Sequence, residues 1–316
     1  MSVLCIGEAL IDMICTDKGS TLSEGQNFLK KPGGAPTNVA AAVGALGGQI
    51  SLSAKVGNDP FGKHLKDVLK SFEVDTQHLI FDSNNFTTFA YVSLMLDGER
   101  DFIFNRGADA ALNLQDVEGI DLNTFSIVHF GSATAFLDGP LKESYYQLLS
   151  EAKNHQKIIS FDPNYRHLLF GNQQETFIEQ SMYFLKKADF TKLSDEEAML
   201  ITRTNHLDAA VEILLDICPG IFAITLGKDG TLLGIQKSTR IIKSIDVQVV
   251  DTTGAGDAFV GAVLYQIDQM GINDLSQLSS EKWNLIIQNA NRAGARTCEY
   301  MGAMEAFKHL NTSIFN

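Results

Sequence analysis

The chain of 316 residues has little cysteine and an excess of acidic over basic residues. Its four cysteines are scattered, without a C-x-x-C pair or metal-ligand spacing, which predicts unpaired thiols in a reducing compartment. The formal net charge of −13 argues against a surface for nucleic acid or anionic membranes, because either would need a basic patch. A small phosphorylated ligand is not excluded, since a few cations and backbone N–H groups can bind one locally.

Long apolar runs and linkers are also lacking. No apolar run approaches the length of a transmembrane helix, and the N-terminus has no basic region typical of a signal peptide. We therefore expect a cytoplasmic protein. With no Pro- or Ser-rich linker, low-complexity tract or internal repeat, residues 1–316 are expected to form a single domain.

Short apolar runs alternate with helical patterns along most of the chain. Runs typical of buried strands lie at 3–6, 51–56, 127–131, 158–162, 190–193 and 222–226. Helical patterns lie at 36–46, 61–72, 140–154, 173–187, 195–202 and 206–217. This alternation predicts an α/β fold with a central, mostly parallel sheet covered by helices on both faces.

One region breaks this alternation. Strand-like runs at 87–96 and 100–104 flank Asp97-Gly98, a pair typical of hairpin turns. A hairpin inside a chain of alternating strands and helices indicates a flap beside the main sheet. We expect a discontinuous β-sheet lid formed by about 13–32 and 86–106, with Arg106 near its base.

Residues 251–257 indicate an anion site. They lie between a strand-like run at 245–250 and a helical pattern at 258–270. The glycines in Gly254-Ala255-Gly256 allow a tight turn whose N–H groups join the free donors of the following helix. Asp257 is then either an ordinary helix cap or a carboxylate that takes part in chemistry.

A second glycine pair begins another helix. Gly33-Gly34 precedes Pro36, which suits the first turn of a helix, and the small residues that follow predict close packing against another backbone. Asn38 in that first turn is placed to face the same ligand as Asp12, a polar residue just past the first strand.

Polar groups also follow three later strands, which predicts one extended ligand site at the carboxyl ends of the sheet. Within these groups, Ser194 and Glu197 fit a capping box. The groups are Asp162, Asn164 and Arg166; Lys192, Ser194 and Glu197; and Thr225, Gly227, Lys228 and Gly230. By contrast, the run from Gly57 to Lys63 resembles a P-loop but is followed by His64 in place of Ser or Thr, so we interpret it as a strand-to-helix turn.

Over nearly its whole length the chain resembles ribokinase-like (PfkB) sugar kinases. The resemblance depends on Gly33-Gly34-Ala35-Pro36-Thr37-Asn38 and Asp251-Thr252-Thr253-Gly254-Ala255-Gly256-Asp257. The runs at 7–12 and 97–100 are most similar to fructokinases.

The resemblance implies a role for each matching residue. Asp257 would be the general base that takes a proton from the sugar hydroxyl, and the N–H groups of Gly254, Ala255 and Gly256 would form the anion hole. The sugar would contact Asp12, Gly33, Gly34, Asn38 and Arg106, with Asn164 and Arg166 at the ATP phosphates. The nucleotide would contact Lys192, Ser194, Thr225, Gly227, Gly230, Gly256 and Asn291, with Gly302 in a nearby loop.

The resemblance also implies metal ions. Glu197 would bind Mg²⁺ through water, although the family's Asn-x-x-Glu motif appears here as Ser194-Asp195-Glu196-Glu197. Asp251 and Thr253 match positions that bind a monovalent cation in some members, so K⁺ is a further candidate.

The leading hypothesis is an ATP-dependent kinase that phosphorylates the 6-hydroxyl of fructose. Within the class, 2-keto-3-deoxygluconate kinase and ribokinase are alternatives; outside it, the alternative is a non-catalytic sugar or nucleotide sensor. A nicotinamide dehydrogenase is disfavoured because no G-x-G-x-x-G follows the first strand. Pairing through the lid would give a homodimer, and a monomer remains equally open.

Overall fold

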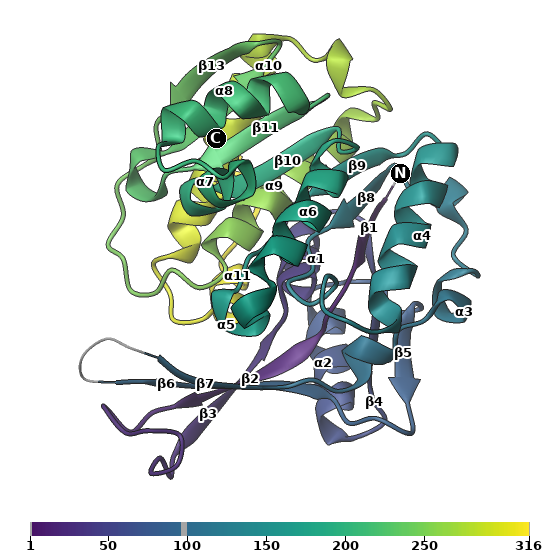
Figure 1. The fold of residues 1–316 in the computed structure, drawn as a ribbon, viewed down its shortest axis with the longest axis vertical. Helices are drawn as coiled ribbons and strands as arrows, with labels where there is room; N and C mark the ends of the chain where they lie inside the picture. The colour runs from purple at the N-terminus through teal and green to yellow at the C-terminus, as the bar shows by residue number, and fades with distance from the viewer. Residues whose placement is uncertain (1, 96–99, 316) are drawn as a thin grey trace.

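A nine-stranded sheet forms the centre of the computed structural model, which describes residues 2–95 and 100–315 (Figure 1). Its strands are parallel except for the two at one edge, which are antiparallel. The order is β13 (Ser238–Ile242), β12 (Thr231–Ile235), β11 (Ile221–Thr225), β10 (Phe190–Ser194), β9 (Ile158–Phe161), β8 (Ile127–Phe130), β1 (Val3–Ile6), β4 (Ile50–Gly57) and β5 (Leu79–Asp82). The expected mostly parallel sheet is confirmed.

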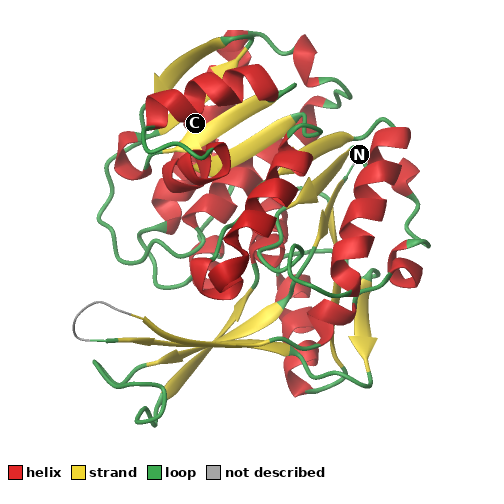
Figure 2. Cartoon of the chain, viewed as in Figure 1, coloured by secondary structure: helices red, strands yellow, loops and turns green. Residues whose placement is uncertain are grey.

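Helices cover both faces of this sheet (Figure 2), and each face has its own apolar core. One core includes α1 (Ala35–Ala45), α2 (Pro60–Ser71), α9 (Ala255–Met270), α10 (Ser280–Thr297) and α11 (Ala303–Phe307). The other includes α3 (Leu114–Val117), α4 (Pro140–Asn154), α5 (His167–Phe170), α6 (Gln174–Leu185), α7 (Asp195–Thr202) and α8 (Leu207–Ile217). No helix within the described ranges is long and apolar enough to cross a membrane.

A smaller, separate sheet projects from one side of this body (Figure 1). Its order is β3 (Phe28–Gly33), β2 (Leu10–Cys15), β6 (Thr88–Leu94) and β7 (Arg100–Asn105). The strands β6 and β7 pair antiparallel, as expected of a hairpin, while the Asp97-Gly98 turn lies outside the described residues. Asp12 lies within β2, not in a loop after the first strand.

One edge of the main sheet differs from the sequence-based expectation. The prediction of a strand at 245–250 is wrong, because these residues form no strand in the described structure. Val249 and Val250 are largely exposed. A hairpin of β12 and β13 forms the edge, with Gln236 and Lys237 at positive φ in its two-residue turn. The turn contains neither Gly nor Asn, so it lacks the usual signal of such a hairpin.

The predicted close packing of the first helix is confirmed. Helix α1 packs against α9, where a Cβ placed on Gly261 would lie 2.7 Å from the Ala42 Cβ and 3.4 Å from the Val39 carbonyl oxygen. The absence of a side chain at Gly261 lets the two backbones approach, which fixes the N-terminal turn of α1 relative to that of α9.

Gly261→Leu is expected to lower the free energy of unfolding by about 1–3 kcal/mol, because the added side chain would force α1 and α9 apart. Chemical denaturation measures this change. Gly119→Leu is the matched control, since a Cβ there would meet nothing within 4 Å. Equal losses for the two variants would contradict the inferred packing.

Candidate active site

Asp257 lies in the first turn of α9 and is only 8% exposed. The turn before it depends on Gly254, which has a φ of 83° and would clash with the Ala303 Cβ if it carried a side chain. The N-terminus of α9 therefore carries a buried carboxylate beside its own unsatisfied N–H donors. Of the three residues expected to form an anion hole, Ala255 already donates its N–H to the Thr252 carbonyl at 3.2 Å.

Asn38 connects the two glycine-rich turns. Its Nδ2 donates a hydrogen bond to Asp257 Oδ2 at 2.8 Å, while its buried Oδ1 has no hydrogen-bond partner in the described part of the chain. Burial raises the pKa of Asp257, and this hydrogen bond together with the charges of Arg166 and Lys192 opposes the rise. The unpartnered amide oxygen is placed to accept a hydrogen bond from a ligand.

Asp12 projects from the small sheet toward the same place. In the β2–β3 pair its carboxylate lies against Gly33, where a Cβ would collide with Asp12 Oδ2. Although the residue as a whole is half-buried, burial of its carboxylate raises the pKa of Asp12 to about 6, opposed by the positive charge of Arg166. Arg166 thus lies close enough to act on Asp12 and Asp257 together.

A buried ion pair completes the polar group beside α9. Lys192 Nζ lies 3.1 Å from Asp162 Oδ2, with side-chain exposures of 9% and 1%. Burial raises the pKa of Asp162, and Lys192 opposes the rise; burial lowers the pKa of Lys192, but the carboxylates of Asp162 and Glu197 more than reverse this. A Cβ on Gly256 would lie 3.3 Å from Lys192 Nζ, so the ammonium group lies directly beside the N-terminus of α9.

Glu197 connects the end of β10 with the loop that follows β9. It forms the expected capping box with Ser194, accepting the Ser194 N–H at 2.8 Å while Ser194 Oγ accepts the Glu197 N–H at 3.1 Å. Its other carboxylate oxygen accepts the Tyr165 N–H at 2.8 Å. Asn164, next to Tyr165, has a φ of 48° and donates its Nδ2 to the Gly131 carbonyl at 2.8 Å.

The candidate nucleotide residues lie around β11 and β12. Thr225 ends β11, and Gly227 and Gly230, both at positive φ, enclose the short turn before β12. Asn291 on α10 is buried, and both ends of its amide are already bonded: Oδ1 to Thr231 at 2.6 Å and Nδ2 to the Ile242 carbonyl at 2.9 Å.

Asp251 links the α9 turn to the C-terminal loop. Its Oδ1 accepts the Thr253 N–H and hydroxyl at 3.0 and 2.8 Å, and its Oδ2 accepts the Gly302 N–H at 2.8 Å. These hydrogen bonds, together with Lys31, outweigh burial and lower the pKa of Asp251, so it is an anion at neutral pH.

Arg106, like Asn291, is an expected ligand residue whose polar atoms are already bonded within the protein. It donates to Asp109 Oδ2 at 3.2 Å and to the carbonyls of Asp138 and Thr134 at 2.7 and 3.0 Å. Sequence reasoning also missed Glu8, a carboxylate only 1% exposed, whose pKa burial raises to about 7. The available signal was an acidic residue directly after a fully apolar strand and Gly7.

Within the described ranges, no three His, Cys, Asp or Glu side chains converge into a metal-ligand set. Mg²⁺ that arrives with ATP takes its ligands mainly from phosphate and water, and needs few protein groups. The Glu197 carboxylate fits such an outer role, because each of its oxygens accepts one backbone N–H and keeps a lone pair for a metal-bound water.

Glu197→Gln is expected to lower the free energy of unfolding by about 1–2 kcal/mol, because an amide NH₂ would face one of the two backbone N–H groups that Glu197 now accepts. Urea denaturation measures the change. The exposed neighbour Glu196, changed to Gln, removes the same charge from the same helical turn. If Glu196→Gln cost as much, the loss would come from helix electrostatics and not from the capping box.

Nearly the whole chain is similar to known carbohydrate kinases. A model of the pfkB family carbohydrate kinases matches residues 1–310. A probable fructokinase-2 of Arabidopsis thaliana is 36% identical over 309 residues, covering 96% of this chain and 92% of the plant protein.

Solved structures agree with this match. A fructokinase of Vibrio cholerae O395 with fructose, ADP and calcium bound is 31% identical with a TM-score of 0.84, covering 100% of this chain and 98% of that chain; a double mutant was solved with fructose, ADP and potassium. An uncharacterized sugar kinase of Pyrococcus horikoshii in complex with ATP is 32% identical with a TM-score of 0.81, covering 96% of this chain and 94% of that chain. With its ribokinase-like α/β fold, this chain belongs to the pfkB family of carbohydrate kinases.

Proposed function

We propose that the protein transfers the γ-phosphoryl group of ATP to the 6-hydroxyl of fructose. The observation that carries the proposal is the buried Asp257 carboxylate at the N-terminus of α9, hydrogen-bonded to Asn38. A carboxylate in contact with an anion-binding helix end suits a reaction that deprotonates a hydroxyl as it attacks a phosphate. Fructose as the acceptor is supported by the plant and Vibrio relatives.

In this proposal the sugar lies between the small sheet and α1. Asp12 and Asn38 bind its hydroxyls, and the backbone of Gly33 and Gly34 borders it. Asp257 removes the proton of the attacking hydroxyl, and the N–H groups at 254–256 bind the oxygens of the transferred phosphoryl group. Because Ala255 donates to Thr252, we expect the turn to adjust when the phosphoryl group arrives.

The nucleotide lies along the ends of β9 to β12. Arg166 and Lys192 supply positive charge for the phosphates, Asn164 offers the N–H of Nδ2 that does not bond Gly131, and Ser194 borders them. Thr225, Gly227 and Gly230 form the turn beside the base and ribose. Asn291 and Arg106 act by positioning backbone, since their polar atoms are bonded within the protein.

Two cations belong to the proposal. Mg²⁺ would enter with ATP and neutralise phosphate charge, with Glu197 contacting it through water. K⁺ would lie beside Asp251 and Thr253, where the carboxylate is an anion and joins the C-terminal loop to the α9 turn.

We further infer a cytoplasmic homodimer. All four cysteines lie in the described ranges and are free thiols, which suits a reducing compartment. The small sheet exposes Ile14, Leu29 and Leu94 on one face, as its strand register requires, and a second copy of this sheet would cover these apolar side chains. Light scattering at several protein concentrations tests the dimer.

The isosteric change Asp257→Asn is expected to lower kcat for fructose by about 10²–10⁴-fold, because it removes the base while keeping an oxygen for Asn38. ADP release is measured with fructose, ribose, 2-keto-3-deoxygluconate and nucleosides. No turnover of fructose by the unchanged protein would refute the proposed substrate. Binding of sugar and ATP without ADP release would support a non-catalytic sensor instead.

The pH profile tests the Asn38 contact. Because Asp257 must be ionised to act as base, kcat/KM falls as pH drops through its pKa, which burial places above the ordinary value of 3.8. Asn38→Ala removes a hydrogen bond that favours the ionised form, so the acid limb of the profile should move to higher pH. Asn58→Ala, at an exposed residue, is the control; an unmoved or lowered limb in Asn38→Ala would rule out this contact as the cause.

A further inference from the structure

The buried carboxylate of Glu8 has no role in the chemistry proposed above, yet it bonds to the turn that precedes Asn38. It follows β1 and is 1% exposed. Its Oε1 accepts the N–H of Ala35 at 3.1 Å and that of Ala133 at 3.3 Å, and its Oε2 accepts the Ser132 hydroxyl at 2.5 Å. All of these neighbours donate hydrogen bonds to Glu8.

The main chain of Glu8 contacts the same turn as its side chain. Its carbonyl accepts the Thr37 hydroxyl at 3.0 Å and lies where a Cβ on Gly34 would collide with it. Contacts to residues 34, 35 and 37 therefore fix the turn immediately before Asn38. Because Asn38 bonds Asp257, a shift of this turn would move the group that orients the base.

From Ser132 the hydrogen bonds continue to the small sheet. Thr134 donates its N–H to Ser132 Oγ at 3.2 Å and its hydroxyl to Asp109 Oδ2 at 2.9 Å. Asp109 also accepts the hydroxyl of Thr88, the first residue of β6, and the Nε of Arg106, which follows β7. Glu8 is thereby connected to β6 through buried groups, and to the end of β7 through the half-buried Arg106.

We propose that Glu8 is a positioning residue for sugar phosphorylation. It holds the turn at 34–38 directly, and it holds the base of β6 and β7 through Ser132, Thr134 and Asp109. The two parts of the site are thereby fixed relative to each other. The proposal depends on the proposed function for the role of Asn38 at the sugar. It assigns Arg106 to the same network, at its far end, and not to direct contact with the substrate.

Glu8→Gln tests the role because glutamine has nearly the same shape but the wrong hydrogen-bonding pattern. If its oxygen accepts the N–H groups of Ala35 and Ala133, its NH₂ faces Ser132 Oγ, which already accepts from Thr134 and Ala135. The flipped amide would place NH₂ against the two N–H donors. Either orientation leaves donors facing donors, so the turn must shift.

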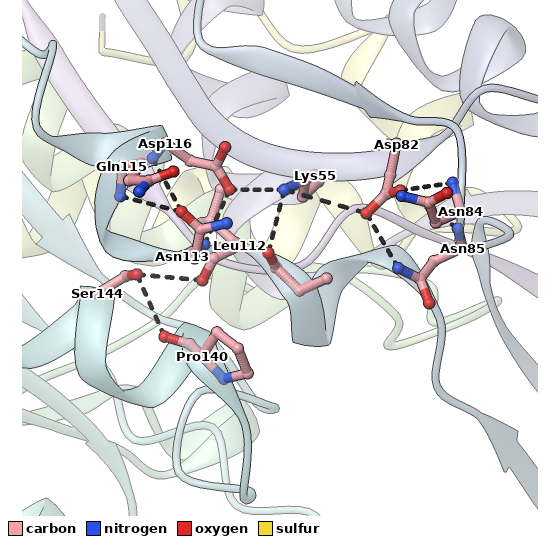
Figure 3. Close-up of polar contacts among 11 residues, drawn as sticks. Lys55, Asp82, Asn84, Asn85, Leu112, Asn113, Gln115, Asp116, Pro140 and Ser144 are labelled. Carbon is pink, nitrogen blue, oxygen red and sulfur yellow. Dashed lines mark hydrogen bonds and ion pairs between the residues drawn. The ribbon is translucent and has the colours of Figure 1, made fainter.

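The matched control is Asp116→Asn, in the group of hydrogen bonds around Lys55 (Figure 3). Lys55 Nζ donates to Asp116 Oδ2 at 2.7 Å and to the Ala111 carbonyl at 3.1 Å, with Asp82 4.0 Å away. Changing Asp116 to Asn mismatches a half-buried carboxylate, which bonds to Lys55 and to the Asn113 N–H and not to the turn at 34–38. Both variants should lower Tm.

The measurement separates KM from kcat at a pH above the raised pKa of Glu8. Glu8→Gln should lower kcat/KM for the sugar by about 10- to 100-fold through both constants, as expected for a misplacement near 1 Å, while KM for ATP changes by less than about twofold. In an Asn38→Ala background the same change should cost less than about threefold, because the misplaced group is already absent. Asp116→Asn should leave the sugar constants unchanged.

Glu8→Gln with a lowered Tm but unchanged sugar constants would overturn the proposal, as would equal effects of Glu8→Gln and Asp116→Asn on those constants. If Glu8→Gln does not fold, Ser132→Ala breaks the same connection at its second residue and must show the same selective loss for the sugar. The unchanged protein is first assayed on the sugar panel. Lack of fructose turnover would refute the proposed substrate alone, and Glu8→Gln would then be compared on whichever sugar is phosphorylated.

Discussion

The contact between α1 and α9 is the constraint on which the rest of the site depends. Small residues along the two helices, with Gly261 against Ala42, bring their N-terminal turns close enough for Asn38 to bond Asp257. Each turn begins at a glycine with positive φ, Gly34 before α1 and Gly254 before α9. One packing distance therefore positions both the base and the group that orients it.

The negative charges of the carboxylates in this site are only partly compensated by nearby cations. Three carboxylates, those of Asp12, Asp162 and Asp257, have pKa values raised by burial, and two cations, Arg166 and Lys192, oppose that rise. Such a cluster is costly to assemble in a protein interior, because each buried charge loses its hydration. The arrangement suits a site that binds highly charged ligands in a chain with net charge −13.

Sequence reasoning predicted what depends on local pattern. Strand and helix periods gave most of the main sheet, and the paired glycines located both turns around Asp257. It failed where tertiary contacts determine the local structure. The hairpin turn at Gln236 lacks the usual turn residues. Residues 245–250 have a strand-like sequence, but the Val250 N–H bonds to the carbonyl at the end of α10. The Thr134 and Asp138 carbonyls that bind Arg106, and the donors that bind Glu8, lie over 25 residues away in sequence, which no local pattern encodes.

The divided origin of the small sheet has a consequence for how the chain folds. Strands β2 and β3 are complete by Gly33, but β2 must wait for β6, which begins at Thr88, to gain its parallel partner. A two-stranded pair is marginally stable alone, so during synthesis the first half of this sheet depends on β4, α2 and β5 being made before it can be completed. Asp12 would consequently reach its final place late, after the surrounding main sheet has begun to pack.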